Sequence, residues 1–430
     1  AWAASADGAI SSSMSFGGAV AVNRVQNTAS IALNNATLKN TSSARLHAKD
    51  DSALWTLAGN VTVGAGDKGA GVSGAVAYSI SGREDSPGTA VSVNGITVTN
   101  ETAAGEADIS TDIDVKAEAT DHVSTLVVSA GISTGTVGFA GAAGVNDIKR
   151  KVSATVDNLV GRDLRDVSIE AFEDADIDNL SLTAAYGTTA GVGLGIAVNR
   201  IDNETRAALT ADQKSTAEEA PQFEANSLSV KAHTDNDIDT IGIGGAGGQT
   251  GAGAGSVAIN LITSDTRAEL TNITGNVDAY GIVNAQSDDT IGAYTGNASG
   301  STSYAAALSV TVNEKKGTTS ATVTNSDLTH TGNSTETGTV NKGVADSAIN
   351  DGIVGDIDVG ASLVGDRSEQ RVSGLSIGAT STETYKTFVI NGSGSVTGAG
   401  AGTVSVTYHG GDTTTTVSGS NLSAKGDVDI

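Results

Sequence analysis

Cysteine is absent from this 430-residue chain, which also has only two prolines, one methionine and 3% aromatic residues. The absence of cysteine is compatible with export across membranes as an unfolded chain, and also with a cytosolic protein. Because large aromatic side chains usually dominate globular cores, their scarcity leaves valine, isoleucine, leucine and alanine to fill the interior. A core of such small and branched residues favours thin, stacked layers.

Basic residues are outnumbered, with 24 lysines and arginines against 49 acidic residues and a formal charge of −25. A surface of this sign repels nucleic acid, so we expect no nucleic-acid partner. The charge also keeps a large extended body soluble. No run of 18 apolar residues occurs in the sequence, and we therefore expect no membrane-spanning segment.

What the chain does contain is a repeated phrase with two anchors. The first anchor is a strand-like stretch that closes on Asn23, Asn146, Asn199, Asn260 and Asn313, with Ser79 and Thr407 as weaker matches. The second is an apolar-polar alternation that closes on Ala48, Ala117, Ala171, Ala232, Ala285 and Ala361. A leucine or valine lies ten residues after most of the first anchors: Leu33, Val156, Leu209, Leu270, Val323 and Val417. Recurrence of this length indicates an array whose units rest on their neighbours.

The composition and the alternation both indicate strands. Glycine, valine, threonine, serine and asparagine disfavour helices, and period-two alternation with β-branched residues favours strands. The sequence therefore predicts an all-β fold, a β-solenoid of the right-handed parallel β-helix kind, built from imperfect repeats of about 53–76 residues. With about 20 residues in a rung, each unit supplies two to three rungs, and the chain forms a rod on the order of 100 Å long. A single helical turn is the best helical candidate, at Ser215–Ala220.

Within the asparagine-anchored stretch, one face of the strand carries β-branched side chains and the other carries small ones. Val20 and Val22 share one parity, while Ala21 and Asn23 share the other. The small side either allows a second layer to approach closely or stays mildly exposed. The recurring asparagine either forms a ladder between rungs or occupies a turn at the rung corner. The glycine runs before it, such as Gly244–Gly248, predict close backbone approach or positive φ, with a flexible linker as the alternative.

Candidate chemistry is sparse. Two aspartate-rich pieces, at 174–178 and 235–239, carry oxygen ligands at alternate positions, but they lack the known calcium-loop patterns and are predicted to be solvated turns. The five histidines are scattered and are expected in loops: His47, His122, His233, His330 and His409. No nucleophile elbow, zinc-protease motif or P-loop occurs. The sequence therefore predicts no enzyme and no catalytic, cofactor-binding or metal residues, with Ca²⁺ as the one open alternative.

The repeats predict one continuous array over residues 1–430, regular over 1–325 and more divergent over 326–430. The last residues, Gly426–Ile430, start a new phrase, and the first residues lie inside one. We therefore expect the chain to be a slice of a longer repetitive protein.

A resemblance to a known family rests on three parts of the phrase. These are Ala-Val-Ala-Val-Asn-Arg-Val at 19–25, the glycine- and alanine-rich run before it, and Thr-Arg-Ala-x-Leu at Thr205–Leu209 and Thr266–Leu270. They are similar to the repeat region of giant bacterial surface adhesins of the filamentous-haemagglutinin-like and leukotoxin-type kinds. The resemblance implies an exported, long β-helical stalk that displays adhesive tips. It assigns no functional residue to this chain.

The resulting hypothesis is a structural and adhesive stalk segment of a large secreted bacterial surface adhesin or extracellular filament. Expected partners are host or bacterial surface molecules, including glycans, and further copies of the chain that stack end to end into fibres. Two alternatives stay open: a carbohydrate-active β-helix, such as a polysaccharide lyase or tailspike-like depolymerase, and a calcium-dependent surface-layer or matrix protein. The first needs clustered acids with aromatic platforms, and Trp2 and Trp55 are the only tryptophans.

Overall fold

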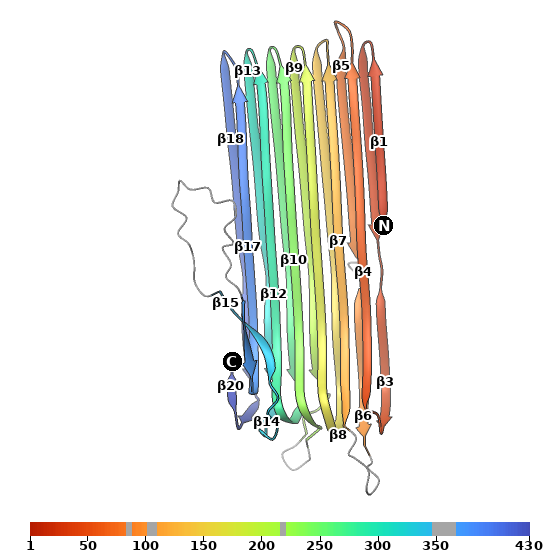
Figure 1. The fold of residues 1–430 in the computed structure, drawn as a ribbon, viewed down its shortest axis with the longest axis vertical. Coiled ribbons are helices and arrows are strands. Elements are labelled where there is room, and N and C mark those ends of the chain that lie inside the picture. The colour runs from red at the N-terminus through yellow and green to blue at the C-terminus, as the bar shows by residue number, and fades with distance from the viewer. Residues whose placement is uncertain (83–87, 101–109, 216–220, 346–366) are drawn as a thin grey trace.

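The computed structural model describes residues 1–82, 88–100, 110–215, 221–345 and 367–430. Every regular element in these ranges is a β-strand, and one large parallel sheet contains nearly all of them. Figure 1 shows the long strands side by side along the vertical axis of the molecule. The prediction of an all-β solenoid is confirmed. Within the described residues, no helix has the length and apolar character needed to cross a membrane.

Each coil crosses the molecule twice, so the sheet forms two facing layers. The outward crossings form layer A: β1 (Trp2–Ser11), β4 (Ser43–Gly64), β7 (Thr111–Ser133), the second half of β8, β10 (Phe223–Gly248), β12 (Thr274–Ser301) and β17 (Gly374–Gly394). The whole of β8 spans Val137–Gly187, and its first half belongs to the other layer. The return crossings form layer B: β2 (Met14–Val25) with β3 (Ala29–Lys39), β5 (Ala70–Gly82) with β6 (Thr89–Thr99), the first half of β8, β9 (Ala190–Thr210), β11 (Gly251–Thr271), β13 (Tyr304–Thr324) and β18 (Gly398–Ser418). The short strands β14 (Asp327–His330) and β19 (Asn421–Ala424) follow β13 and β18, and β14 pairs with β19 and with the first residues of β12. The short β20 (Asp427–Asp429) pairs with β17, and β15 (Gly338–Ala345) and β16 (Arg367–Val372) form a separate antiparallel pair.

One repeat makes one coil, so the prediction of two to three rungs per repeat is wrong. Asn260 and Asn313 are 53 residues apart and occupy the same register position on neighbouring strands. The 26 residues of β10 extend about 86 Å, whereas seven strands spaced by about 4.8 Å cover only about 29 Å. The long axis therefore lies along the strands, and the expected rod of about 100 Å in the stacking direction is also wrong. The coil is this wide because the alternation of inward- and outward-facing residues continues from the alanine anchor into the glycine run without a turn, so that both lie in one long strand.

The register confirms the anchors that define the repeat. The first anchors form one row across layer B: Asn23, Ser79, Asn146, Asn199, Asn260, Asn313 and Thr407. The following apolar positions form another row: Leu33, Val93, Val156, Leu209, Leu270, Val323 and Val417. The alanine anchors form a row across layer A that continues from Ala285 to Ala379. Ala361, the expected last anchor, and residues 216–220 of the predicted helical turn lie outside the described residues.

The two ends of each coil have different interiors. We call Thr240–Asn260 and the residues in register with them the small-residue half; it is the upper end in Figure 1, where β5, β9 and β13 are labelled. The remainder is the apolar-core half, whose buried cluster is rich in valine, isoleucine and leucine, such as Val115, Ile169 and Leu209. The interior of the small-residue half is instead alanine, serine, threonine, asparagine and glycine. Small side chains there let the two layers approach closely.

The anchor asparagines form a ladder inside the small-residue half. Each side-chain amide donates to the next side-chain oxygen at 2.9 Å, from Asn146 to Asn199, from Asn199 to Asn260 and from Asn260 to Asn313. All four side chains are buried between the layers in mid-strand. Of the two interpretations that the sequence allowed, the ladder is confirmed and the corner turn is wrong.

Other asparagines occupy the corners. Asn158, Asn272 and Asn325 have φ near +50° to +60°, and Gly419 takes the same conformation, where the chain leaves layer B. Asparagine and glycine tolerate this left-handed backbone better than other residues. The predicted corner role therefore exists, but it belongs to asparagines outside the anchor row.

The glycine runs lie in strands, so the linker interpretation is wrong. Gly244 belongs to β10, and a Cβ atom there would lie 2.3 Å from Oδ1 of Asn297 and 2.9 Å from the carbonyl oxygen of Gly255. Close approach between layers requires glycine at this position. The small parity of the anchor stretch, represented by Ala19 and Ala21, is buried, while Val20 and Val22 face outward.

Candidate functional site

Two rows of aspartates lie side by side on the outer face of layer A. Asp174, Asp176 and Asp178 of β8 stand in register with Asp235, Asp237 and Asp239 of β10. We call these six residues the acidic rows. They occupy alternate positions in the middle of long strands, so the prediction of solvated turns is wrong. The alternation that suggested spaced ligands is the two-residue period of a strand, which directs all six to one face.

Like charges on neighbouring strands raise the proton affinity of this surface. Burial, together with the adjacent carboxylates of Asp239 and Asp176, raises the pKa of Asp237 to about 7. Burial also raises the pKa of Asp176, although the hydrogen bond from His122 opposes the shift. Adjacent strands are about 4.8 Å apart, so each carboxylate has a like charge within Coulombic reach. Burial raises the pKa of Asp174 and Asp239 as well, so four of the six carboxyl groups bind protons more tightly than isolated aspartates do.

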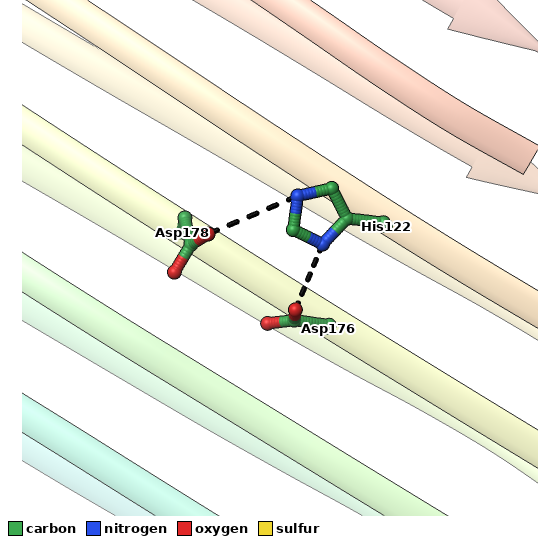
Figure 2. Close-up of side chains that lie close together, drawn as sticks. All are labelled: His122, Asp176 and Asp178. Carbon is green, nitrogen blue, oxygen red and sulfur yellow. Dashed lines mark hydrogen bonds and ion pairs between the residues drawn. The ribbon is translucent and has the colours of Figure 1, made fainter.

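His122 of β7 joins the acidic rows from the neighbouring strand. Figure 2 shows its ring between Asp176 and Asp178 of β8. The Nδ1 atom lies 2.8 Å from Oδ2 of Asp176, and the Nε2 atom lies 3.8 Å from Oδ2 of Asp178 and 2.8 Å from Oγ of Ser124. The parallel register places His122 directly opposite Asp176, 54 residues away in sequence. The loop position expected for this histidine is wrong.

The cluster offers ligand atoms for a cation. One ligand atom from each of His122, Asp176 and Asp178 lies within 4.8 Å of the others. Carboxylate oxygens with an imidazole suit a divalent cation. The cluster also places serine, histidine and aspartate in hydrogen-bonding order. However, the backbone around Ser124 is engaged in the parallel ladder with β4 and β8, so its N–H groups are not free to stabilise an oxyanion. The geometry therefore favours binding over acyl transfer.

An open groove of about 480 Å³ begins at the edge of this cluster. Trp2 and Trp55 lie opposite each other in its wall because β1 pairs with β4. Tyr294 and Asp239 also line it. The carboxylates and aromatic platforms that the carbohydrate-active alternative requires thus lie together. The sequence did not reveal this proximity, because Trp2 and Trp55 are far apart along the chain.

The remaining histidines also lie in strands, which corrects the loop prediction for all five. His47, His233, His330 and His409 belong to β4, β10, β14 and β18. His233 lies 3.3 Å from a carboxylate oxygen of Asp288 on the neighbouring strand. His47 lies 3.5 Å from Glu118 in the same way. These contacts are cross-strand pairs on outer faces.

A buried ionic cluster lies between the layers and was missed by sequence reasoning. The Arg150 side chain is fully buried, donates from Nη1 to Asp50 and from Nη2 to Asp121, each at 2.8 Å, and also bonds Ser52. Lys315 makes a similar pair with Asp289 at 3.1 Å. The sequence does contain a signal for this cluster, because Arg150 occupies the alternate position between Ile148 and Val152 and therefore falls on the interior face of the strand.

Glu173 is also fully buried, and burial raises its pKa well above the usual range. Its interior position therefore favours the neutral carboxylic acid, which a buried site tolerates better than a carboxylate.

Comparisons of this chain with protein-family models, with curated proteins and with solved structures find no match. The likeness to adhesin repeats therefore rests on the sequence phrases. The function that this likeness implies is a proposal.

Proposed function

We propose that this chain is a structural and adhesive segment of a large secreted bacterial surface adhesin or extracellular filament, and that it is not an enzyme. The observation that carries the proposal is the unbroken register, which links the anchor row through every strand of layer B from Asn23 to Thr407. Each coil stabilises its neighbours through backbone ladders and the buried asparagine ladder. Such an array is extended by adding coils. The likeness of the repeat phrase to surface adhesins supports a location outside the bacterial cell.

The two ends of the stack supply a route to assembly. Layers A and B end in β1 and β2 on one side, and in β17 and β18 on the other. Sheet edges present backbone donors and acceptors that another strand can pair with. Contact between such edges supports growth into fibres, while loops and outer faces offer surface to host or bacterial molecules, glycans included.

Removing one complete coil tests the proposal. Deletion of 261–313 joins Asn260 to Glu314, which already occupies the register position of Leu261 on the next strand. We expect this variant to fold with an unchanged β-sheet circular dichroism spectrum and a stack shorter by about 4.8 Å in small-angle scattering. Deletion of 261–287, about half a coil, is the matched control. It joins layer B directly to layer A and is expected not to fold.

Two results would contradict the structural role. If the half-coil deletion folds as well as the full-coil deletion, the coil is not the unit of the array. If the intact chain releases products from acidic or neutral polysaccharides, the carbohydrate-active alternative replaces the proposal.

A second candidate, a calcium-dependent surface-layer or matrix protein, is favoured by the grouping of His122, Asp176 and Asp178. Calcium binding to the folded chain raises the melting temperature through mass action. The expected observation is a rise with Ca²⁺ that disappears on chelation and in the Asp176→Asn, Asp178→Asn double variant. An unchanged melting temperature in the intact chain excludes this candidate.

A further inference from the structure

The small-residue half is almost free of charge. No charged residue occurs in 123–146, 179–199, 240–264, 290–313 or 387–408. These stretches come from five successive coils and lie beside one another in both layers. The acidic excess of the chain is therefore concentrated in the apolar-core half.

Apolar side chains on this half point outward on both faces. One outward row of layer B includes Val20, Val76, Ile196, Val257, Val310 and Val404. Exposed fractions reach 64% at Val20 and 53% at Leu308, on the next row. Layer A shows the same pattern, with Ile241 and Ile243 of β10 exposed at 40% and 47%.

The distribution is inverted relative to a water-soluble sheet sandwich. The interior holds polar side chains that form hydrogen bonds with one another, as in the asparagine ladder and in the bond from Ser73 to Asn60 at 2.6 Å. Alanines fill much of the remaining interior, whereas the larger apolar side chains, such as Val20 and Leu308, are mostly on the outside. A structure with polar contacts inside and an apolar band outside is the arrangement found where strands face lipid.

The height of the band matches lipid hydrocarbon. In layer B it runs from Met14 to Val22, nine residues that extend about 30 Å. In layer A it runs from Leu57 to Gly64, eight residues that extend about 26 Å. The hydrocarbon core of a bilayer is about 30 Å thick.

Aromatic residues mark both margins of the band. Trp2, Trp55 and Tyr408 lie at the margin next to the charged half, and Tyr186 and Tyr304 lie next to the turns. All five are between 48% and 75% exposed. Tryptophan and tyrosine favour the interface between hydrocarbon and headgroups. The turns beyond the second margin are polar, as in the Gln249–Thr250 and Thr302–Ser303 connections.

We propose that the small-residue half inserts into the hydrocarbon of a lipid bilayer while the charged half stays in water. A bilayer covers both outer faces at once, whereas a second copy stacked on one face leaves the other exposed. Stacking in the same direction would also bring the acidic rows of one copy against another highly acidic surface. Backbone groups at the sheet edges would need pairing with further coils or copies, because lipid satisfies none of them.

The sequence criterion could not detect this band. It asks for 18 consecutive apolar residues, and a strand places only every second residue on its outer face. The proposal goes beyond the structural role of the array and replaces the expectation that no segment of the chain enters a membrane.

Flotation with phosphatidylcholine vesicles tests the proposal. The intact chain is expected to float with the vesicles, and its two tryptophans, both at the margin, are expected to shift their emission to shorter wavelength. Leu308→Asp places a charge inside the band, and Thr322→Asp, on an outward position of the same strand, places one in the charged half. Because a charge on a lipid-facing strand is costly, we expect Leu308→Asp to reduce partitioning at least about 10-fold and Thr322→Asp to leave it unchanged.

Both positions face outward, so both variants are expected to keep the circular dichroism spectrum and melting temperature of the parent in buffer. The proposal is overturned if the intact chain fails to float, or if the two variants float equally well. A discrete dimer in light scattering that Leu308→Asp disrupts, without vesicle binding by the parent, would instead assign the band to a second copy. None of these outcomes affects the coil-deletion experiment, so the two proposals can fail separately.

Discussion

Replacing Asn199 by alanine removes the centre of the buried ladder. The Asn199 amide donates to Asn260 at 2.9 Å and to Thr240 at 2.6 Å, and its oxygen accepts from Asn146 at 2.9 Å and Asn179 at 2.8 Å. The residue has no exposed surface. Four hydrogen bonds are therefore lost in a site that excludes bulk water.

The expected cost follows from what the neighbours retain. Asn179 still donates to the carbonyl of Gly144, and Asn260 still accepts from Thr240. The Nδ2 group of Asn146 is left without its acceptor. A net loss of about 1 kcal/mol for each of the other three hydrogen bonds, with about 1–3 kcal/mol for the orphaned donor, gives about 4–6 kcal/mol.

Urea denaturation followed by circular dichroism measures this change in the free energy of unfolding. Asn23→Ala is the matched control, because Asn23 lies at the end of the same row and makes one bond, to the carbonyl of Trp55 at 3.2 Å. Its expected cost is about 1 kcal/mol. Equal losses for the two variants would refute the reasoning, since the ladder would then add nothing beyond a single hydrogen bond.

Two further substitutions probe buried and surface charges. Arg150→Met leaves Asp50 and Asp121 buried without their partner and is expected to cost about 3–5 kcal/mol in urea denaturation; a loss below about 1 kcal/mol would contradict this. Asp237→Asn removes a carboxyl whose pKa rises from 3.8 to about 7 on folding. The folded state binds the extra proton between about pH 4 and 7, so the parent loses stability as pH rises through this window. The variant should therefore match the parent near pH 4 and exceed it by about 2 kcal/mol above pH 7, after allowance for partial exposure. A difference independent of pH would contradict the assignment.

The repeat phrase was sufficient to predict the strands and to identify the positions that are equivalent from one repeat to the next. Positions with the same role in the phrase, such as Asn199 and Asn260, stand directly opposite each other. Even the weak matches Ser79 and Thr407 occupy the anchor row. This succeeds because stacked coils place equivalent residues side by side, so the pattern that fits one interior fits the next.

The candidate site was not predictable in the same way. Asp176 and Asp237 were assigned to turns because aspartate is common there, but tertiary pairing keeps both in strands. His122 meets Asp176 only because β7 and the second half of β8 share a register set by the whole array. Local composition carries no information about that distance.

The sequence by itself determined the all-β class, the equivalence of positions from repeat to repeat and the existence of two alternating faces, since these follow from period-two patterning repeated along one chain. Only the tertiary structure decided that a coil is a single wide circuit and that, in the asparagine-anchored stretch, alanine and asparagine face inward while valine faces out. Either parity of a strand can face a neighbouring layer. The choice is made by the separation of the two layers, which near Gly244 is too small for a larger side chain.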